Sequence, residues 1–238
     1  GVKYGLEGIP IKSKINYNNN EFTVALVKGT DDIDITYSLD SIHWKAYSTP
    51  FNIDKSSTIY AKGLKNKKAY GILVQEVIKC KSTGKKVSYI TPYSELYKGN
   101  KEKSLTDGLI GSSDNFRDGY YQGFFGTDFE VIIDFEETTS FSEIHSTFFQ
   151  YYLSWIILPT SVTYSVSDNG KDFYEISSIE NTISLMKEGK FKHDFMFKEK
   201  GLSARYVKIT AKNIDKLPEI HPAAGSAAWL FIDEITIN

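Results

Sequence analysis

Cysteine and net charge are both nearly absent from this sequence. Cys80 is the single cysteine among 238 residues, so a disulfide within the chain is excluded and the redox compartment stays undetermined. The 28 lysine and arginine residues almost balance the 30 aspartate and glutamate residues, and the two signs are interspersed. Because nucleic-acid binding needs a concentrated basic surface, we expect no nucleic-acid partner.

Long apolar runs are missing as well. No run approaches the roughly 20 residues that a membrane-spanning helix requires, so we expect no transmembrane segment. The chain starts at Gly1, without an initiator methionine or a signal peptide. We therefore expect it to be a fragment of a longer protein, whose targeting its first residues do not reveal.

A sustained helical period is the third absence. Apolar and polar residues instead alternate over short stretches such as residues 33–39, 130–135 and 206–211. Alternation with period two indicates β-strands, and turn signals such as Asn169-Gly170 separate them. Many short strands without helices predict an all-β fold of antiparallel sandwiches.

Catalytic motifs are missing too. The sequence contains no GxSxG elbow, no HExxH motif and no glycine-rich phosphate loop, and its four histidines lack metal-ligand spacing. Asp233 and Glu234 are adjacent on an expected strand, so their side chains point to opposite faces and do not converge on one substrate. We therefore expect no active site within this chain.

The strand patterns fall into two groups. Residues 79–86 and 97–104 are polar and rich in lysine, which is typical of solvated connections. Residues 1–90 predict a small immunoglobulin-like β-sandwich, and residues 91–238 predict a second β-sandwich. We place the domain boundary near residue 90.

Residues 105–135 form the most distinctive stretch of the chain. They begin with Asp107-Gly108, continue through a loop rich in Gly, Ser and Asp, cross the aromatic residues between Tyr120 and Phe125, and end in an apolar strand. This order of parts resembles the opening of a factor V/VIII type C, or discoidin-like, domain. The resemblance implies a jelly-roll β-sandwich for the second domain. Because such domains often bind sugars, it also implies a glycan partner.

A narrower resemblance rests on four phrases that occur in chain order. They are Tyr37-Ser38-Leu39-Asp40-Ser41, Thr91-Pro92-Tyr93-Ser94, Trp155-Ile156-Ile157-Leu158-Pro159 and Ala228-Trp229-Leu230-Phe231-Ile232-Asp233-Glu234-Ile235. They resemble the C-terminal region of Bacteroides-type chitobiases, which are β-N-acetylhexosaminidases of glycoside hydrolase family 20. The sequence departs from this pattern at Ser41, where glycine is usual, and at Ile220, where tryptophan is common beside the histidine.

The resemblance implies that the chain is the non-catalytic C-terminal accessory region of a secreted, extracytoplasmic β-N-acetylhexosaminidase-like enzyme. The implied partners are the catalytic domain of the same parent chain and a glycan of the hexosamine or galactose type. Two alternatives stay open. The domains are purely structural and pack on the catalytic barrel, or they form a module for protein or surface adhesion.

The resemblance also implies a structural calcium ion that joins the Asp-Gly loop to a carboxylate on the last strand. The matching ligands are Asp107 and Glu234, with the Ser112 hydroxyl and loop carbonyls, and such an oxygen set suits a hard cation. The alternative is that Asp107 only caps its own turn.

A sugar site needs an exposed aromatic ring for the apolar face of a pyranose and a few polar groups for its hydroxyls. Loops at one end of a sandwich commonly carry function. We expect the ligand contacts to come from Tyr120, Tyr121, Trp155, Arg117 and His221. The alternative places the rings of Tyr121 and Trp155 in the core.

Overall fold

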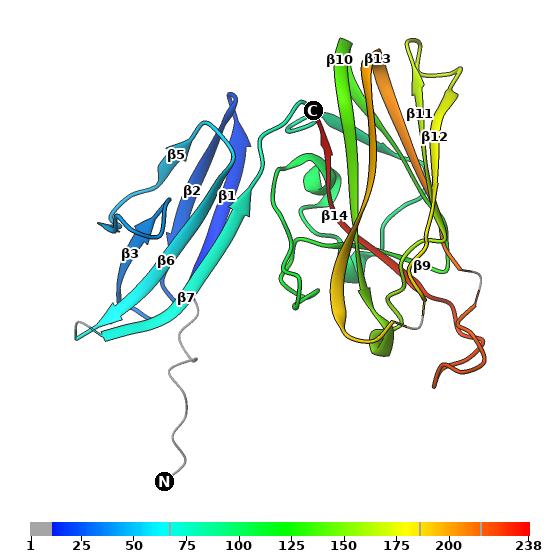
Figure 1. Cartoon of the computed structure of the whole chain (residues 1–238). Coiled ribbons are helices and arrows are strands. Elements are labelled where there is room, and N and C mark those ends of the chain that lie inside the picture. Colours follow the sequence, from blue (N-terminus) through cyan, green and yellow to red (C-terminus); the bar gives the residue numbers. More distant parts are fainter. Residues whose placement is uncertain (1–10, 67, 186, 215) are drawn as a thin grey trace. The chain divides into compact units, whose positions relative to one another are not determined.

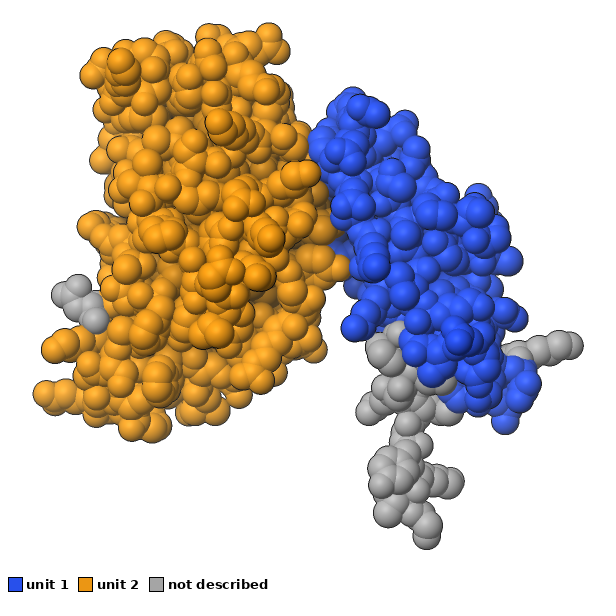
Figure 2. Space-filling view, turned by 180° about the vertical axis from the view of Figure 1, so that it is seen from behind, with its two compact units in different colours: residues 1–79 blue, residues 80–238 orange. Residues whose placement is uncertain are grey.

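Figure 1 shows the computed structural model, which describes residues 11–66, 68–185, 187–214 and 216–238. The chain divides into two compact units, one ending at Lys79 and the other starting at Cys80 (Figure 2). Antiparallel β-strands dominate both units. The described part of the chain has no helix that is long and apolar enough to span a membrane.

Two antiparallel sheets form the first unit, with the orders β1-β2-β5 and β4-β3-β6-β7. The strands are β1 (Lys12–Asn18), β2 (Glu21–Val27), β3 (Asp34–Ser38), β4 (Lys45–Ala46), β5 (Phe51–Ile53), β6 (Ser57–Lys65) and β7 (Lys68–Val77). Alternate residues such as Phe22, Val24 and Ile59 are fully buried. The period-two pattern of the sequence therefore marks the core faces of these strands.

Backbone conformation explains two turns of the first unit. Asn19 and Asn20 have φ angles of 49° and 65° and join β1 to β2 in a two-residue hairpin, where asparagine is favoured. Ser41 has a φ of 63°, a left-handed conformation that glycine adopts without strain. The turn therefore keeps the geometry that glycine would favour, although serine occupies the position.

The second unit consists of strands and short 3-10 helices. The strands are β8 (Lys86–Tyr89), β9 (Gln122–Phe125), β10 (Phe129–Tyr151), β11 (Ser161–Ser167), β12 (Tyr174–Glu180), β13 (Lys190–Lys212) and β14 (Trp229–Ile237). The 3-10 helices are η1 (Glu95–Tyr97), η2 (Lys101–Thr106) and η3 (Tyr152–Ser154). The strand order is β12-β11-β13-β10-β14-β9, with β8 paired to β10.

The long strands β10 and β13, each of 23 residues, run through both layers of the second unit (Figure 1). The first part of β10 pairs with β8 and with the last part of β13, which also pairs with β11. After register shifts between Asp134 and Glu143, the rest of β10 pairs with the first part of β13 and with β14. These irregularities bend the two strands from one layer into the other.

One hydrophobic core lies between the two layers. Phe129 comes from the first part of β10 and Phe148 from its second part, and both side chains are completely buried. Their rings lie 5.9 Å apart in a T-shaped arrangement, which aromatic pairs favour. The predicted all-β fold of antiparallel sandwiches is confirmed.

The structure divides the chain earlier than the sequence analysis did. β8 pairs with residues 131–134 of β10, and the Ser82 hydroxyl donates to the carbonyl of Ile235 at 2.7 Å and accepts from the amide of Ile237. Residues 80–90 therefore belong to the second unit, although we predicted the boundary near residue 90. Their polar composition resembles a linker, but hydrogen bonds to the last strand hold them in place.

Candidate functional site

An open pocket of about 220 Å³ lies at the end of the second unit where β14 begins. Its walls come from η1, from the loop between η2 and β9, from η3 with the residues that follow it, and from the start of β14. The aromatic and cationic residues of these walls are Tyr97, Phe116, Arg117, Trp155, Trp229 and Phe231.

A glycine in β9 makes room for the aromatic wall. A Cβ atom on Gly123 would lie 2.8 Å from the ring of Phe231 and 3.1 Å from the ring of Trp229. Without that side chain, the ring of Tyr97 packs 4.6 Å from Phe231 and 5.2 Å from Trp229. The ring of Phe116 lies 5.6 Å from Phe231 and 6.1 Å from Tyr97. The wall is therefore a packed set of rings, which fixes the ring faces that line the pocket.

Trp155 is held at its backbone while its ring stays partly exposed. Its φ is 63°, in the left-handed region that bulky residues rarely adopt. The Trp155 amide donates to the carbonyl of Tyr152, and its carbonyl accepts from the amide of Trp229 at 2.8 Å. The side chain is 38% exposed. Backbone strain at a residue that lines a pocket is typical of functional sites.

Arg117 is the cationic group of the pocket. Its guanidinium carbon lies 5.0 Å from the ring centroid of Phe116, and its backbone amide donates to the side chain of Asn115. No ion pair engages Arg117 within the described residues. Together with the Ser154 hydroxyl, the guanidinium offers hydrogen-bonding groups beside the aromatic rings and the side chains of Leu153 and Ile156.

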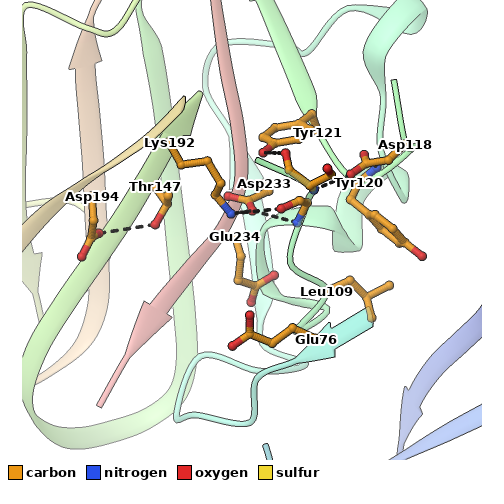
Figure 3. A network of polar contacts seen from close by, with 12 residues as sticks. Glu76, Leu109, Asp118, Tyr120, Tyr121, Thr147, Lys192, Asp194, Asp233 and Glu234 are labelled. Atoms are coloured by element: carbon orange, nitrogen blue, oxygen red, sulfur yellow. Dashed lines mark hydrogen bonds and ion pairs between the residues drawn. The ribbon is translucent and has the colours of Figure 1, made fainter. Parts of the chain in front are cut away.

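The loop that carries Phe116 and Arg117 is anchored to the sheet (Figure 3). Asp233 on β14 is completely buried, pairs with Lys192 of β13 and accepts from the amide of Gly111 at 2.9 Å. The Lys192 ammonium also donates to the carbonyl of Gly111 at 3.2 Å, and Lys190 donates to the carbonyl of Asp114 at 2.8 Å. Burial raises the pKa of Asp233, while Lys192 opposes this shift.

Further hydrogen bonds close the same loop on itself. Asp118 accepts from the amides of Ser112 and Tyr120 through its two carboxylate oxygens. The Tyr121 hydroxyl donates to the carbonyl of Ser112 at 2.7 Å (Figure 3). Residues 111–121 are therefore bound both to themselves and to β13 and β14, which fixes the pocket wall without covering the pocket.

Among the predicted sugar contacts, Trp155 and Arg117 line the pocket. Both therefore lie at the same end of the second unit, and their contact with a ligand stays a prediction. Tyr120 is partly buried and does not line the pocket.

Tyr121 and His221 lie in the interior, contrary to the prediction that they contact a ligand. Tyr121 is 2% exposed and its ring packs 5.3 Å from that of Phe149, so it belongs to the core. His221 is 4% exposed. Its Nε2 bonds to the carbonyl of Tyr152 and its Nδ1 accepts from the amide of Ala223, both at 2.9 Å. Both ring nitrogens are thus occupied, and the imidazole stabilises the loop that precedes β14.

The sequence analysis missed the aromatic residues that complete the pocket. Tyr97 lies in a segment interpreted as a solvated connection, and Trp229 entered the sequence analysis only as part of a motif that resembles chitobiases. A weak signal existed for Trp229, because the first residue of a strand borders the loops at the end of a sandwich. The sequence contains no such signal for Tyr97, because the position of Tyr97 depends on packing against Phe231, which is remote in sequence.

The two carboxylates predicted to hold calcium come from different elements, Asp107 from the turn after η2 and Glu234 from β14. Glu234 accepts from the amide of Gly108 at 3.1 Å through one oxygen, while its buried Oε1 has no hydrogen-bond partner in the described structure. Asp107 accepts from the amide of Leu109 at 2.9 Å and from the side chain of Asn100 at 3.1 Å. Asp107 therefore caps its own turn, as the alternative proposed, and also lies close to Glu234.

Electrostatics at this turn favour a positive charge. Burial raises the pKa of Asp107 to about 7. Burial also raises the pKa of Glu234 well above its ordinary value, and the charge of Asp107 adds to that shift. Ser112 does not join them, because its hydroxyl donates to Asp114. The described residues contain no group of three or more histidine, cysteine or acidic side chains that could hold a metal. A cation here would thus depend on two carboxylates and backbone carbonyls.

Comparisons with known proteins gave matches among solved structures only. No protein-family model and no curated protein matches the chain. SpGH29 matches at 13% identity and a TM-score of 0.41, over 67% of this chain and 27% of that chain. The C-terminal domain of a chitobiase from Bacteroides fragilis matches at 16% identity and a TM-score of 0.37, over 64% of this chain and 93% of that chain.

A CBM32 module from Clostridium perfringens, in complex with GalNAc-beta-1,3-galactose, matches at 13% identity and a TM-score of 0.39. It covers 64% of this chain and 93% of that chain. Solved structures similar to this chain thus include carbohydrate-binding modules.

Proposed function

We propose that the second unit is a non-catalytic glycan-binding module whose pocket receives a single sugar ring. The observation that carries this proposal is the pocket in which Trp155, Trp229 and Arg117 converge. Its volume of about 220 Å³ is below the ~300–1,000 Å³ of pockets that hold drug-sized ligands, so it suits one ring.

The chemistry of the walls matches the two sides of a pyranose. The C–H face of the sugar is apolar and gains by packing on an aromatic ring that is otherwise in contact with water. The hydroxyls need hydrogen-bond partners, which Arg117 and Ser154 supply. A pocket that holds a single ring should bind it weakly, and a Kd of about 1 mM corresponds to about −4.1 kcal/mol.

The finer identity of the module rests on the sequence motifs that resemble chitobiases. The chain is the C-terminal accessory region of a secreted, extracytoplasmic β-N-acetylhexosaminidase-like enzyme, and its ligand is of the hexosamine or galactose type. In such an enzyme the module raises the effective concentration of substrate near the catalytic domain of the same chain. The hydrolytic step lies outside this chain, since Asp233 and Glu234 are buried and bonded to the loop after η2.

A titration tests the glycan-binding function. Wild-type protein is titrated with N-acetylglucosamine, N-acetylgalactosamine and galactose to millimolar concentration, and binding is followed by NMR chemical shifts. Trp155→Ala and Arg117→Ala should abolish the shifts that the binding sugar causes. Tyr174→Ala is the matched control, because Tyr174 is an exposed aromatic residue on β12 outside the pocket. No shift with any of these sugars, or unchanged binding in Trp155→Ala, would refute the proposal.

We also propose a structural calcium ion between Asp107 and Glu234. The unpartnered Oε1 of Glu234 and the raised pKa values of the two carboxylates support it. Calcium would neutralise two buried negative charges and tie the turn after η2 to β14. It would hold the start of the loop that carries Phe116 and Arg117.

A structural role is the second candidate function, and the first unit favours it. Ile72 and Val74 alternate on the edge strand β7, where they are 70% and 58% exposed. An apolar edge of this kind is typical of a surface that another domain covers. If the sugars do not bind, packing against another domain of a longer chain becomes the better explanation of the fold.

A further inference from the structure

Phe125 is an exposed aromatic residue directly beside the sugar pocket. It is the last residue of β9 and is 46% exposed, whereas its neighbour Phe124 is completely buried. The alternation of the strand explains this difference, because Phe124 faces the core and Phe125 faces outward. Phe125 is not among the residues that line the pocket.

Trp229 connects Phe125 to the pocket. The two residues are directly opposite each other on the paired strands β9 and β14, so their side chains share a face of the sheet. Their ring centroids lie 4.7 Å apart, with 38° between the ring planes. Trp229 lines the pocket, and its ring contacts Tyr97 as well. One aromatic surface therefore continues from the pocket across Trp229 to Phe125.

Exposure along this surface increases outward. Phe231, next along the same face of β14, is 1% exposed, Trp229 is partly exposed, and Phe125 is nearly half exposed. A single exposed phenylalanine is common on protein surfaces and by itself indicates nothing. Here the exposed ring extends a pocket that is too small for more than one sugar ring.

We propose that Phe125 and the adjoining part of Trp229 form a second subsite, which takes the next sugar ring of the glycan held in the pocket. This inference depends on the proposed glycan-binding function. The occupant is a sugar ring because the surface is aromatic and continuous with a site of the same chemistry. The protein would thus recognise a disaccharide or a longer chain and not only a terminal monosaccharide.

The experiment measures how affinity depends on the length of the glycan. The probes are N-acetylglucosamine with its β-1,4-linked dimer and trimer, and N-acetylgalactosamine with GalNAc-β-1,3-galactose. In the series that binds, the wild-type protein should bind the disaccharide about tenfold more tightly than the monosaccharide, which corresponds to about 1.4 kcal/mol. Phe125→Ala should keep the monosaccharide affinity and lose this gain.

Two further variants control for indirect effects. Phe125→Leu preserves an apolar side chain without a flat ring, so it should also lose most of the gain while the melting temperature stays at the wild-type value. Tyr174→Ala should retain the whole gain, because Tyr174 is also an exposed aromatic residue but lies on β12, at the other end of the sheet order from β9.

The outcomes separate the two proposals. A wild-type protein that binds monosaccharide and disaccharide equally refutes the second subsite and leaves the pocket intact. A Phe125→Ala variant that keeps the tenfold gain in affinity also refutes the second subsite. So does sedimentation velocity that shows a dimer for the wild type and a monomer for Phe125→Ala, because Phe125 would then contact a second copy of the chain. A wild-type protein that binds none of the sugars refutes the proposed function itself.

Discussion

The backbone conformation of Trp155 points to a functional role for this residue. The left-handed conformation at φ 63° would suit glycine, yet the chain places its largest side chain there. For a residue with a Cβ this conformation is less favourable by about 1–2 kcal/mol. The ring is only partly buried, since it remains 38% exposed. A strained residue whose ring lies partly exposed at a pocket is a candidate for a binding role.

Trp155→Gly tests this interpretation. Glycine relieves the left-handed strain, so this variant should be more stable than Trp155→Ala by about 1 kcal/mol. Both variants should lose sugar binding. Thermal unfolding gives the stabilities and NMR titration gives the affinities. A loss of several kcal/mol in both variants would instead identify Trp155 as a core residue.

Asp107 and Glu234 carry a second prediction at the residue scale, on pH dependence. The pKa of Asp107 rises from its ordinary value of 3.8 to about 7 in the folded protein, because the carboxyl group is buried. Between these values the folded state binds more protons than the unfolded state, so stability should fall as the pH rises from about 4 to about 7. Each pKa unit is worth about 1.4 kcal/mol.

Calcium should remove much of the loss of stability at neutral pH, because the ion neutralises the same buried carboxylates. We expect calcium to raise the melting temperature more at pH 8 than at pH 5, since protonation competes with the ion at low pH. Glu234→Gln should abolish the calcium response and weaken the pH dependence. Differential scanning calorimetry with calcium or with chelator measures both effects. Equal melting temperatures in calcium and chelator at pH 8 would exclude the ion.

At the scale of elements, sequence alone predicted the strands but not their arrangement. Period-two alternation is a local property, so the strands containing residues 33–39 and 206–211 were evident. The bend that carries β10 from one layer to the other depends on register shifts between pairs remote in sequence. The site divides in the same way. Loop position identified Trp155 and Arg117, whereas only tertiary packing shows that Tyr121 is buried and that Tyr97 faces the pocket.

The loop at residues 111–121 is an element whose position depends on two lysines of β13. Lys190 and Lys192 lie on the same face of the strand and donate to carbonyls of this loop. Lys192 also neutralises the buried Asp233, and removing one partner of such a buried pair is destabilising by about 3–5 kcal/mol. Lys190 is exposed, so its bond to the loop contributes little to global stability.

Lys190→Gln should therefore change the site without changing the fold. We expect the free energy of unfolding to stay within about 0.5 kcal/mol of the wild type, as for other surface substitutions. Sugar affinity should fall. Faster amide exchange in residues 111–118 should accompany the weaker binding. The control is Lys198→Gln. Lys198 lies farther along β13, and the substitution removes its ion pair with Glu143 of β10. A matching loss of affinity in the control would contradict the positioning role.

At the scale of the whole molecule, each unit has its own sheets and its own core, and the pocket proposed to bind sugar lies within the second unit. We therefore expect the second unit to fold and to bind sugar without residues 1–79. The contacts of β8 define where it starts. Val87 is 7% exposed and belongs to the core of this unit, and β8 covers one edge of β10.

Two truncated proteins test this division. Residues 80–238 should unfold in one cooperative transition and bind sugar with the affinity of the whole chain. Residues 91–238 lack β8 and the Ser82 hydrogen bonds to β14, so the first part of β10 becomes an unpaired edge and Val87 leaves the core. Loss of a buried aliphatic side chain alone removes about 1.5–3 kcal/mol, and the exposed edge favours aggregation. The shorter protein should therefore melt at a clearly lower temperature. Equal melting temperatures for the two proteins would place the boundary near residue 90 after all.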